Sequence, residues 1–301
     1  MEVVFCKVFV LKDLRQITVI GLGLLGGSVS LAVERCFSGV KAVGYSHRAA
    51  TRRKARRLGV ASEVVDDMKS AVRGADIVIL ATPIFTFEQV FAAITDALHA
   101  GCIVTDVGST KVLPHRWASR TFRRAVRYVG SHPIAGSEQR GVEYARDDLF
   151  DGALCIVTHT KQSDGGAVAL LKGFWSQVGC RVELMSPAGH DRVFGDVSHV
   201  PHVTAAALVN ASKSEELKFC GKGFMDSSRI ASGPANIWTD VLLANADNVC
   251  RGIDRVVAEL GKLKGALDAG DAKVVEKLLE RARRKRNSLI SYKMNKRELI
   301  P

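Results

Sequence analysis

Two patterns of hydrophobic and polar positions alternate along the first half of the chain. Short, continuous apolar runs rich in Val and Ile are separated by segments whose apolar residues recur with a helical period. Continuous apolar runs are typical of strands buried on both faces, and strand–helix repetition predicts a parallel, doubly wound α/β sheet. We predict strands in "QITVIGLG" (16–23), "VKAVGYS" (40–46), "ADIVILATP" (75–83), "GCIVTDVG" (101–108) and "VRYVG" (126–130). We predict helices at 24–35, 49–59, 86–98 and 109–125, then two more strands at 153–160 and 180–186 flanking a helix at 164–178.

After Pro187 the pattern is helical throughout. Three long segments with helical period follow, at 189–212, 236–267 and 272–289, and no strand pattern separates them. We therefore expect an α/β domain over residues 1–186 and an all-helical domain over 187–301. Such elongated helices cannot bury their own apolar stripes, which predicts a homodimer formed through the helical domain.

The composition is that of a globular protein without a membrane span. The 301 residues are 47% hydrophobic and 25% charged, as in a globular protein with a substantial core. No apolar run reaches the ~20 residues needed to span a bilayer, and "MEVVFCKVFVL" lacks the features of a signal peptide. Seven scattered cysteines without a CxxC pair favour a reducing cytoplasm over a disulfide framework or a zinc site.

A net charge of +12 raises the question of nucleic acid. Two basic clusters, Arg48–Arg57 and Arg281–Arg297, lie in helical patterns, where a solvated face explains them. Aromatic residues make up only 6% of the chain, and no nucleic-acid motif is present. We expect neither a nucleic-acid nor a membrane partner, and a positive field also suits a small polyanion.

The stretch "IGLGLLGGS" places Gly21, Gly23 and Gly26 in G-x-G-x-x-G spacing between a predicted strand and a predicted helix. In this context the first glycine makes the tight turn, the second admits a pyrophosphate, and the third lets helix and strand pack closely. The sequence thus predicts a Rossmann-type dinucleotide site, with Leu25 in the first turn of its helix.

The residues at the end of the next predicted strand indicate whether the cofactor is NADP or NAD. An acid about 20 residues after the glycines usually holds the ribose 2′-hydroxyl of NAD. Here Ser46 takes that place, followed by His47, Arg48 and Thr51. An acid would repel a 2′-phosphate, whereas hydroxyls and a guanidinium bind it. We favour NADP over NAD, although the arginines could equally be the exposed face of the next helix.

Three predicted strands are followed by candidate site residues: Thr82-Pro83, Ser109 and His132. We expect His132 at the C-terminal end of its strand. Ligands of open α/β sheets lie outside the C-terminal ends of strands. Ser109 could also be only the N-cap of a helix that starts at Thr110. The helical half adds two histidines in "SHVPH", His199 and His202. No acidic or cysteine partner is spaced to complete a metal site with them, so we predict no metal.

These motifs, in this order, resemble the prephenate/arogenate dehydrogenase family of tyrosine biosynthesis. The resemblance runs from about residue 16 to 295 and is carried by "GLGLLGGS", "ATP", "DVGSTK", "HPIAGSE", "SPAGHDRVF…SHVPH" and "GFMDSSRIASGP". It implies a cyclohexadienyl acid as substrate, which loses hydride from C4 to the nicotinamide and its ring carboxylate as CO₂.

The resemblance also assigns roles to residues. It implies that His132 is the catalytic histidine acting on the 4-hydroxyl, and that Ser109 binds the same hydroxyl. An imidazole with a pKa near the operating pH suits proton transfer. The family's carboxylate-binding arginine corresponds to Arg229. The other positions that the resemblance places at the substrate are His202, Trp238, Glu138 and Asp226, and those at the cofactor include Thr82 and Pro83.

Two departures from the family pattern leave questions open. Met225 stands where bacterial members often carry a lysine, and Lys222 lies three residues earlier, so prephenate and arogenate remain alternatives. Ser46 replaces the acid of NAD-preferring members, in line with NADP. Rival interpretations are a β-hydroxyacid dehydrogenase or a pyrroline-carboxylate reductase, neither of which predicts "HPIAG", and a non-catalytic NADP-sensing protein, which would need neither His132 nor Arg229.

Overall fold

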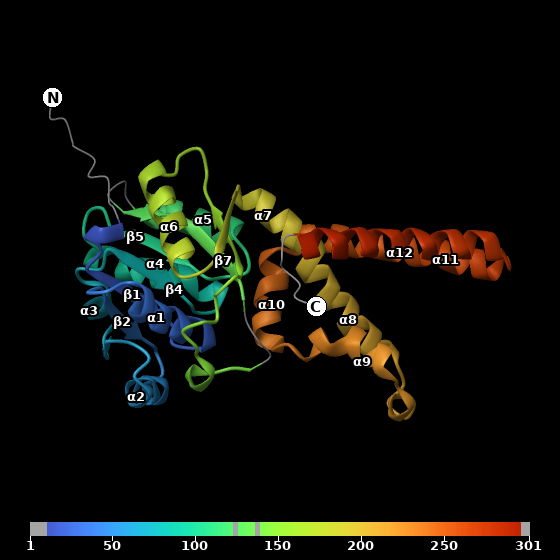
Figure 1. Cartoon of the computed structure of the whole chain (residues 1–301), viewed down its shortest axis with the longest axis horizontal. Helices are drawn as coiled ribbons and strands as arrows, with labels where there is room; N and C mark the ends of the chain where they lie inside the picture. Colours follow the sequence, from blue (N-terminus) through green and yellow to red (C-terminus); the bar gives the residue numbers. More distant parts are fainter. Residues whose placement is uncertain (1–10, 123–125, 136–138, 296–301) are drawn as a thin grey trace. The chain divides into compact units, whose positions relative to one another are not determined.

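The computed structural model describes residues 11–122, 126–135 and 139–295 (Figure 1). The chain divides into two compact units, Met1–Ala246 and Asp247–Pro301. The first unit contains all the strands among the described residues. The second is made of helices only over its described part.

A six-stranded parallel sheet is the centre of the first unit, with strand order β3-β2-β1-β4-β5-β6. This is the doubly wound order of a dinucleotide-binding fold, as predicted. The strands are β1 (Gln16–Ile20), β2 (Lys41–Tyr45), β3 (Glu63–Val64), β4 (Ile77–Leu80), β5 (Ile103–Asp106) and β6 (Arg127–Tyr128). Every residue of β4 and β5 is buried, because helices cover both faces of the sheet.

The helices divide the core into two apolar layers. One layer packs α1 (Leu24–Cys36) and α6 (Gly165–Gln177) against the sheet, with Phe37 and Phe174 stacked at 5.3 Å between ring centroids. The other layer packs α3 (Met68–Val72), α4 (Phe87–Ile94) and α5 (Val112–Thr121). Helix α2 (Ala49–Leu58) buries only Ala55 and exposes most of its arginines.

A second, three-stranded sheet corrects the prediction of one continuous parallel sheet. Strand β7 (Gly130–Ile134) pairs antiparallel with β8 (Leu154–Thr158), which pairs parallel with β9 (Arg181–Met185). The predicted strand at 126–130 is in fact only the two-residue β6, after which the chain crosses to β7. A hydroxyl contact of 2.8 Å between Ser131 and Thr105 joins β7 to β5.

Helices follow β9, as the pattern after Pro187 predicts. The first unit ends with α7 (Pro187–Phe194), a π-helical turn (Gly195–His199), α8 (Val200–Ala211), α9 (Lys222–Ser228) and α10 (Ala235–Ala244). Short 3-10 turns occur at Leu11–Asp13, Ile84–Thr86, Thr95–Ala97, Val142–Tyr144, Leu217–Phe219 and Arg229–Ser232.

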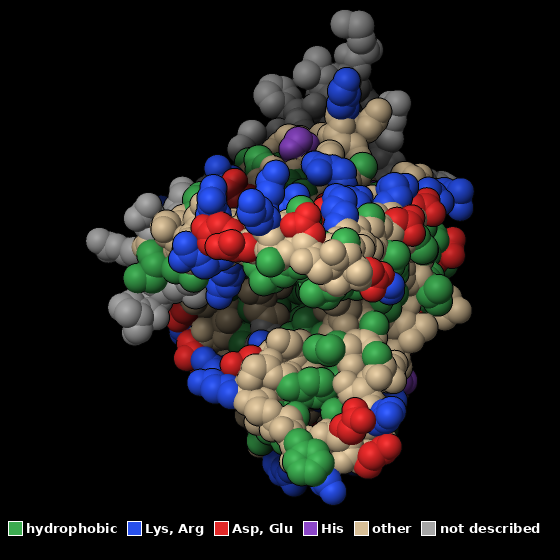
Figure 2. Space-filling model, turned by 90° about the vertical axis from the view of Figure 1, so that its right-hand side faces the viewer, with side chains coloured by type: hydrophobic (Ala, Val, Ile, Leu, Met, Phe, Trp, Pro, Cys, Tyr) green, Lys and Arg blue, Asp and Glu red, His purple; other side chains and the backbone are tan. Residues whose placement is uncertain are grey.

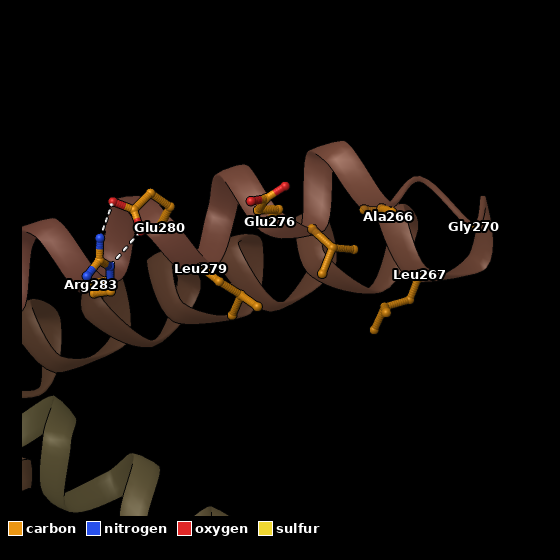
Figure 3. Close-up of a pocket in the computed structure, with 9 residues that line it drawn as sticks. Ala266, Leu267, Gly270, Glu276, Leu279, Glu280 and Arg283 are labelled. Atoms are coloured by element: carbon orange, nitrogen blue, oxygen red, sulfur yellow. Dashed lines mark hydrogen bonds and ion pairs between the residues drawn. The ribbon is translucent and has the colours of Figure 1, made fainter.

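Helices α11 (Ala246–Asp268) and α12 (Ala272–Asn295) form a hairpin. Gly270 makes the turn with φ +63°, and an ion pair between Arg281 and Glu259 joins the two helices. Figure 3 shows the groove on the hairpin, where Leu267 lies near Gly270 at the turn and Leu279 lies nearer the ion pair of Glu280 and Arg283. In the part of the chain that the structure describes, none of the helices is both long and apolar enough to cross a membrane.

Candidate active site

The glycine loop has the geometry of a dinucleotide cradle. Gly21 has φ +105°, and a Cβ there would lie 2.5 Å from the carbonyl oxygen of Ala81. A Cβ on Gly26 would lie 1.8 Å from the carbonyl oxygen of Gly21, so this helix turn packs directly on the loop. A Cβ on Gly23 would meet nothing within 4 Å, and Gly23 is the N-cap of α1 without a side-chain cap. The amides of the first turn of α1, which includes Leu25, are therefore available to an anion.

The turn after β2 carries the residues predicted to select the cofactor. Ser46 is buried, His47 and Arg48 are exposed, and Thr51 is partly exposed in the first turn of α2. Arg48 is the N-cap of α2 and provides no side-chain cap, so the amides of this helix end are open too.

Arg52, on the same helix, holds this turn in place. Its guanidinium donates to the carbonyl of Ser46 at 2.6 Å and to that of His47 at 3.1 Å. It also pairs with Asp66 at 2.7 Å. Thr82 and Pro83 follow β4. The Thr86 hydroxyl lies 2.8 Å from the Thr82 hydroxyl and donates a hydrogen bond to the Pro83 carbonyl at 2.6 Å.

His132 is not at the C-terminal end of a strand of the parallel sheet, as the sequence suggested. It is the third of five residues in β7, where it pairs with Ile156 of β8. Its flanking residues Ser131 and Pro133 are buried, while the imidazole is partly exposed. The second sheet, rather than a strand end, thus sets the position of this side chain.

Ser109 lies in the loop between β5 and α5 and is partly exposed. It is not an N-cap, because α5 begins at Val112 and Lys111 precedes it. A buried network holds the loop: the Lys111 ammonium pairs with Asp106, which also accepts hydrogen bonds from the Tyr128 hydroxyl at 2.5 Å and the Gly108 amide at 2.7 Å. Burial, reinforced by the Asp106 charge, raises the pKa of Tyr128 well above its usual value.

A chain of polar contacts runs from His132 into the protein. Nδ1 of His132 lies 2.9 Å from Nε2 of His190, and Nδ1 of His190 lies 2.8 Å from Oδ1 of Asp191. The Asp191 carboxylate accepts hydrogen bonds from the amides of Lys111 at 2.7 Å and Val112 at 2.9 Å, at the start of α5. His190 is fully buried and stacks on Phe194, with ring centroids 4.5 Å apart.

His190 and Asp191 had no predicted role, although both lie in the "GHD" of the family motif "SPAGHDRVF". The two residues follow β9 on α7, far from His132 in sequence. Only a signal that pairs positions 132 and 190 could have identified the contact.

Burial keeps the histidines of this region neutral. It lowers the pKa of His132 well below the usual histidine value, and the nearby His190, Lys111 and His199 add to the effect. It lowers the pKa of His190 to about 2 and that of His199 to about 4. For Asp191, burial raises the pKa, against the two amide hydrogen bonds.

A second group of side chains lies on the helices after α7. The rings of His202 and Trp238 stack with centroids 3.6 Å apart, at an angle of 9°, and a Cβ on Gly233 would clash with Trp238. His199 meets Trp238 edge to face at 6.2 Å. Nδ2 of Asn245 donates to the Asp191 carbonyl at 2.7 Å and lies 3.1 Å from Nδ1 of His199. The predicted pocket residues His202 and Trp238 are thus connected to the array at His132.

The remaining predicted substrate residues are exposed or outside the described part. Arg229 begins the 3-10 turn Arg229–Ser232 and its side chain is exposed, as are Asp226 and Lys222 on α9. Glu138 lies outside the described residues. Among the residues that are described, no group of three or more His, Cys, Asp or Glu side chains is arranged to hold a metal ion.

Comparisons with known proteins identify the family of the chain. Residues 29–184 match the family model "Prephenate dehydrogenase, nucleotide-binding domain", and residues 186–281 match "Prephenate dehydrogenase, dimerization domain". Prephenate dehydrogenase of Bacillus subtilis is 34% identical over 289 residues, covering 93% of this chain and 76% of that protein.

Two solved structures share the fold along nearly the whole chain. Prephenate dehydrogenase from A. aeolicus, in complex with hydroxyphenyl propionate and NAD+, superposes with a TM-score of 0.85 at 32% identity. The match covers 92% of this chain and 99% of that one. Synechocystis arogenate dehydrogenase superposes with a TM-score of 0.79 at 26% identity, covering 91% and 100% of the two chains.

Proposed function

Because the chain belongs to the prephenate dehydrogenase family of oxidoreductases, we propose that it oxidatively decarboxylates a cyclohexadienyl acid, prephenate or arogenate. The product would be 4-hydroxyphenylpyruvate or tyrosine. The observation that carries the proposal is the placement of a partly exposed, neutral imidazole, His132, in the same compact unit as a dinucleotide cradle. The bound nicotinamide would accept the hydride from C4 of the substrate.

His132 takes the proton of the 4-hydroxyl in this proposal. A neutral imidazole is the form that accepts a proton, and the lowered pKa of His132 keeps it neutral at physiological pH. Ser109, in the loop after β5, would donate to or accept from the same hydroxyl. Its backbone lies close enough to His199 to affect the pKa of that ring, which links the loop to the histidine array.

The substrate would be bound by residues of α8 and of the helical segments that follow it. Arg229 carries the planar fork that suits a carboxylate, and His202, stacked on Trp238, would line the pocket. Asp226 and Glu138 complete the proposed set, the latter on sequence grounds alone.

For the cofactor we propose a preference for NADP over NAD. Ser46 directly follows β2, at the place where an acid would repel a 2′-phosphate, and Arg48 is exposed beside the open amides of the α2 N-terminus. Arg52 supports the turn rather than the ligand, since its guanidinium is committed to two carbonyls and Asp66. His47 and Thr51 would complete the contacts.

We also propose a homodimer assembled through the helical region, with the division between the cofactor and helical domains near residue 186. The hairpin of α11 and α12 exposes apolar side chains that a monomer leaves in water, among them Val257, Leu260, Leu267 and Leu279. Figure 2 shows such hydrophobic side chains among basic and acidic ones on one face of the molecule. The unpaired cysteines of the described part fit our proposal of a cytoplasmic enzyme.

Steady-state rates with prephenate and arogenate, each with NAD+ and NADP+, test the proposal directly. We expect turnover of at least one substrate, and a higher kcat/KM with NADP+ than with NAD+. Failure to oxidise either substrate with either cofactor would refute the proposed activity. A clear preference for NAD+ would refute only the cofactor assignment.

A further inference from the structure

Hydrogen bonding in the buried array determines where each proton lies. Two backbone amides, those of Lys111 and Val112, donate to the Asp191 carboxylate, which accepts hydrogen bonds and has none to give when ionised. The 2.8 Å contact from Oδ1 of Asp191 to Nδ1 of His190 therefore requires a proton on that nitrogen. His190 is fully buried, and burial lowers its pKa to about 2, so the ring is neutral and its Nε2 has no proton.

The same reasoning assigns the proton in the contact between His190 and His132. Nε2 of His190 can only accept, so the 2.9 Å contact with Nδ1 of His132 requires a proton on the His132 nitrogen. A neutral imidazole carries one proton, which leaves the lone pair on Nε2 of His132. We propose that Asp191 and His190 are positioning residues that hold His132 as the Nδ1-protonated tautomer, with Nε2 as the base for the reaction. This inference rests on the proposed function only for its effect on rate.

The contacts of Asp191 also hold the loop between β5 and α5 that carries Ser109. Asp191 binds the first amides of α5, two and three residues after Ser109. Asn245 donates to the Asp191 carbonyl, and Phe194 lies against both imidazole rings, at 4.5 Å from His190 and 5.0 Å from His132. The His190 ring therefore cannot turn over without breaking its contacts with Asp191 and His132.

A purely structural role for the pair predicts different behaviour. If Asp191 only caps α5 and His190 only fills space, removing the imidazole lowers the amount of folded protein. The kcat per folded molecule and the tautomer of His132 would then stay unchanged. In Ser-His-Asp enzymes, loss of the carboxylate that fixes the tautomer lowers kcat by about 10⁴. Here an extra ring separates the carboxylate from the base, so we expect a smaller loss.

The first test is a nitrogen-15 NMR spectrum of histidine-labelled protein with cofactor bound. We expect His132 to be neutral at pH 7.5, with its proton on Nδ1 and none on Nε2. A proton on Nε2 of the neutral ring would overturn the inference. This measurement needs no turnover, so its outcome is independent of whether the proposed substrates are correct.

The second test compares His190→Leu with His190→Gln. Leucine removes the acceptor, and we expect kcat to fall on the order of 100-fold with KM changed less than threefold. Glutamine keeps an oxygen that can accept the Nδ1 proton, so its kcat should lie between those of His190→Leu and wild type. A folded His190→Leu protein with kcat within twofold of wild type would overturn the inference, as would a kcat for His190→Gln below that for His190→Leu.

His115 offers a matched control. It is also a histidine with a pKa lowered by burial, to about 4, and its Nε2 lies 3.0 Å from the Thr158 hydroxyl instead of a catalytic group. His115→Gln should leave kcat and the His132 tautomer as in wild type. A fall in kcat equal to that of His190→Leu would show that any loss of a buried imidazole has this effect, and would overturn the specific role of His190.

Discussion

Gly23→Ala is the change that tests the cofactor cradle most directly. The added Cβ meets no atom of the protein within 4 Å, and Gly23 has φ −92°, which alanine adopts without strain. Alanine is a poorer N-cap than glycine, but it also restricts the unfolded chain by about 0.4–1 kcal/mol. We therefore expect the free energy of unfolding to change by less than about 1 kcal/mol.

Cofactor binding should change much more. The methyl group would occupy the space through which a pyrophosphate approaches the amides of α1. Loss of one charge-assisted hydrogen bond costs about 1.5–3 kcal/mol, which corresponds to a roughly 10- to 100-fold weaker Kd. Calorimetric titration with NADP+ and NAD+, together with a thermal melt, measures both quantities on the same sample.

Alanine substitutions at two other glycines serve as controls. Gly165, the first residue of α6, also has open space around a Cβ, so Gly165→Ala should bind cofactor as wild type does. Gly26→Ala places its Cβ 1.8 Å from the Gly21 carbonyl oxygen, so it should lose both cofactor binding and stability. A Gly23→Ala protein that melts like wild type and binds both cofactors with unchanged Kd would refute the placement of the pyrophosphate at this loop.

Four further outcomes follow from the site. Ser46→Asp should shift kcat/KM toward NAD+ by about 1–3 kcal/mol, since a carboxylate repels a 2′-phosphate; unchanged relative rates with the two cofactors would contradict this. Arg229→Ala should raise KM far more than it lowers kcat, and Arg229→Lys should rescue it poorly. His132→Asn should lower kcat by about 10²–10⁴ with little change in the melting temperature. In the wild-type enzyme, the pH at which kcat falls on the acid side should lie below ~6.5, because the pKa of His132 is lowered. Each of His115 and His199, with pKa values of about 4, binds protons more readily when unfolded. Between pH ~6.5 and pH ~4 the free energy of unfolding should therefore fall by about 1.4 kcal/mol per pH unit for each ring, and urea melts of His115→Gln should show a shallower fall.

The sequence was sufficient for features set by local patterns. The apolar runs correctly predicted β1, β2, β4 and β5 as buried parallel strands, because their side chains face helices on both sides. The glycine spacing predicted the turn before α1 in the same way. Strand β3 and helix α3 were missed, since two residues of strand and five of helix are too short to produce a period.

Features that depend on distant pairing were not predictable from the pattern. "GSHPI" could be read as the end of one strand and a turn, and only its pairing with β8 makes it the antiparallel β7. The contacts of Arg52 are another example, because its guanidinium reaches back to the carbonyls of Ser46 and His47, which no local pattern indicates. The contact between His132 and His190 joins residues 58 positions apart, and no local motif encodes such a partner choice.

One imidazole, that of His190, separates the Asp191 carboxylate from His132, and this separation affects the charge on His132. A carboxylate in direct contact with His132 would raise its pKa and hold a proton on the base before reaction. With His190 between them, His132 remains a neutral acceptor in the ground state. If Nε2 takes up the substrate proton as proposed, the new positive charge lies two hydrogen bonds from the carboxylate. The array therefore orients Nε2 of His132 without raising its basicity, because any contact that stabilised the imidazolium would also raise the pKa of the ring before reaction.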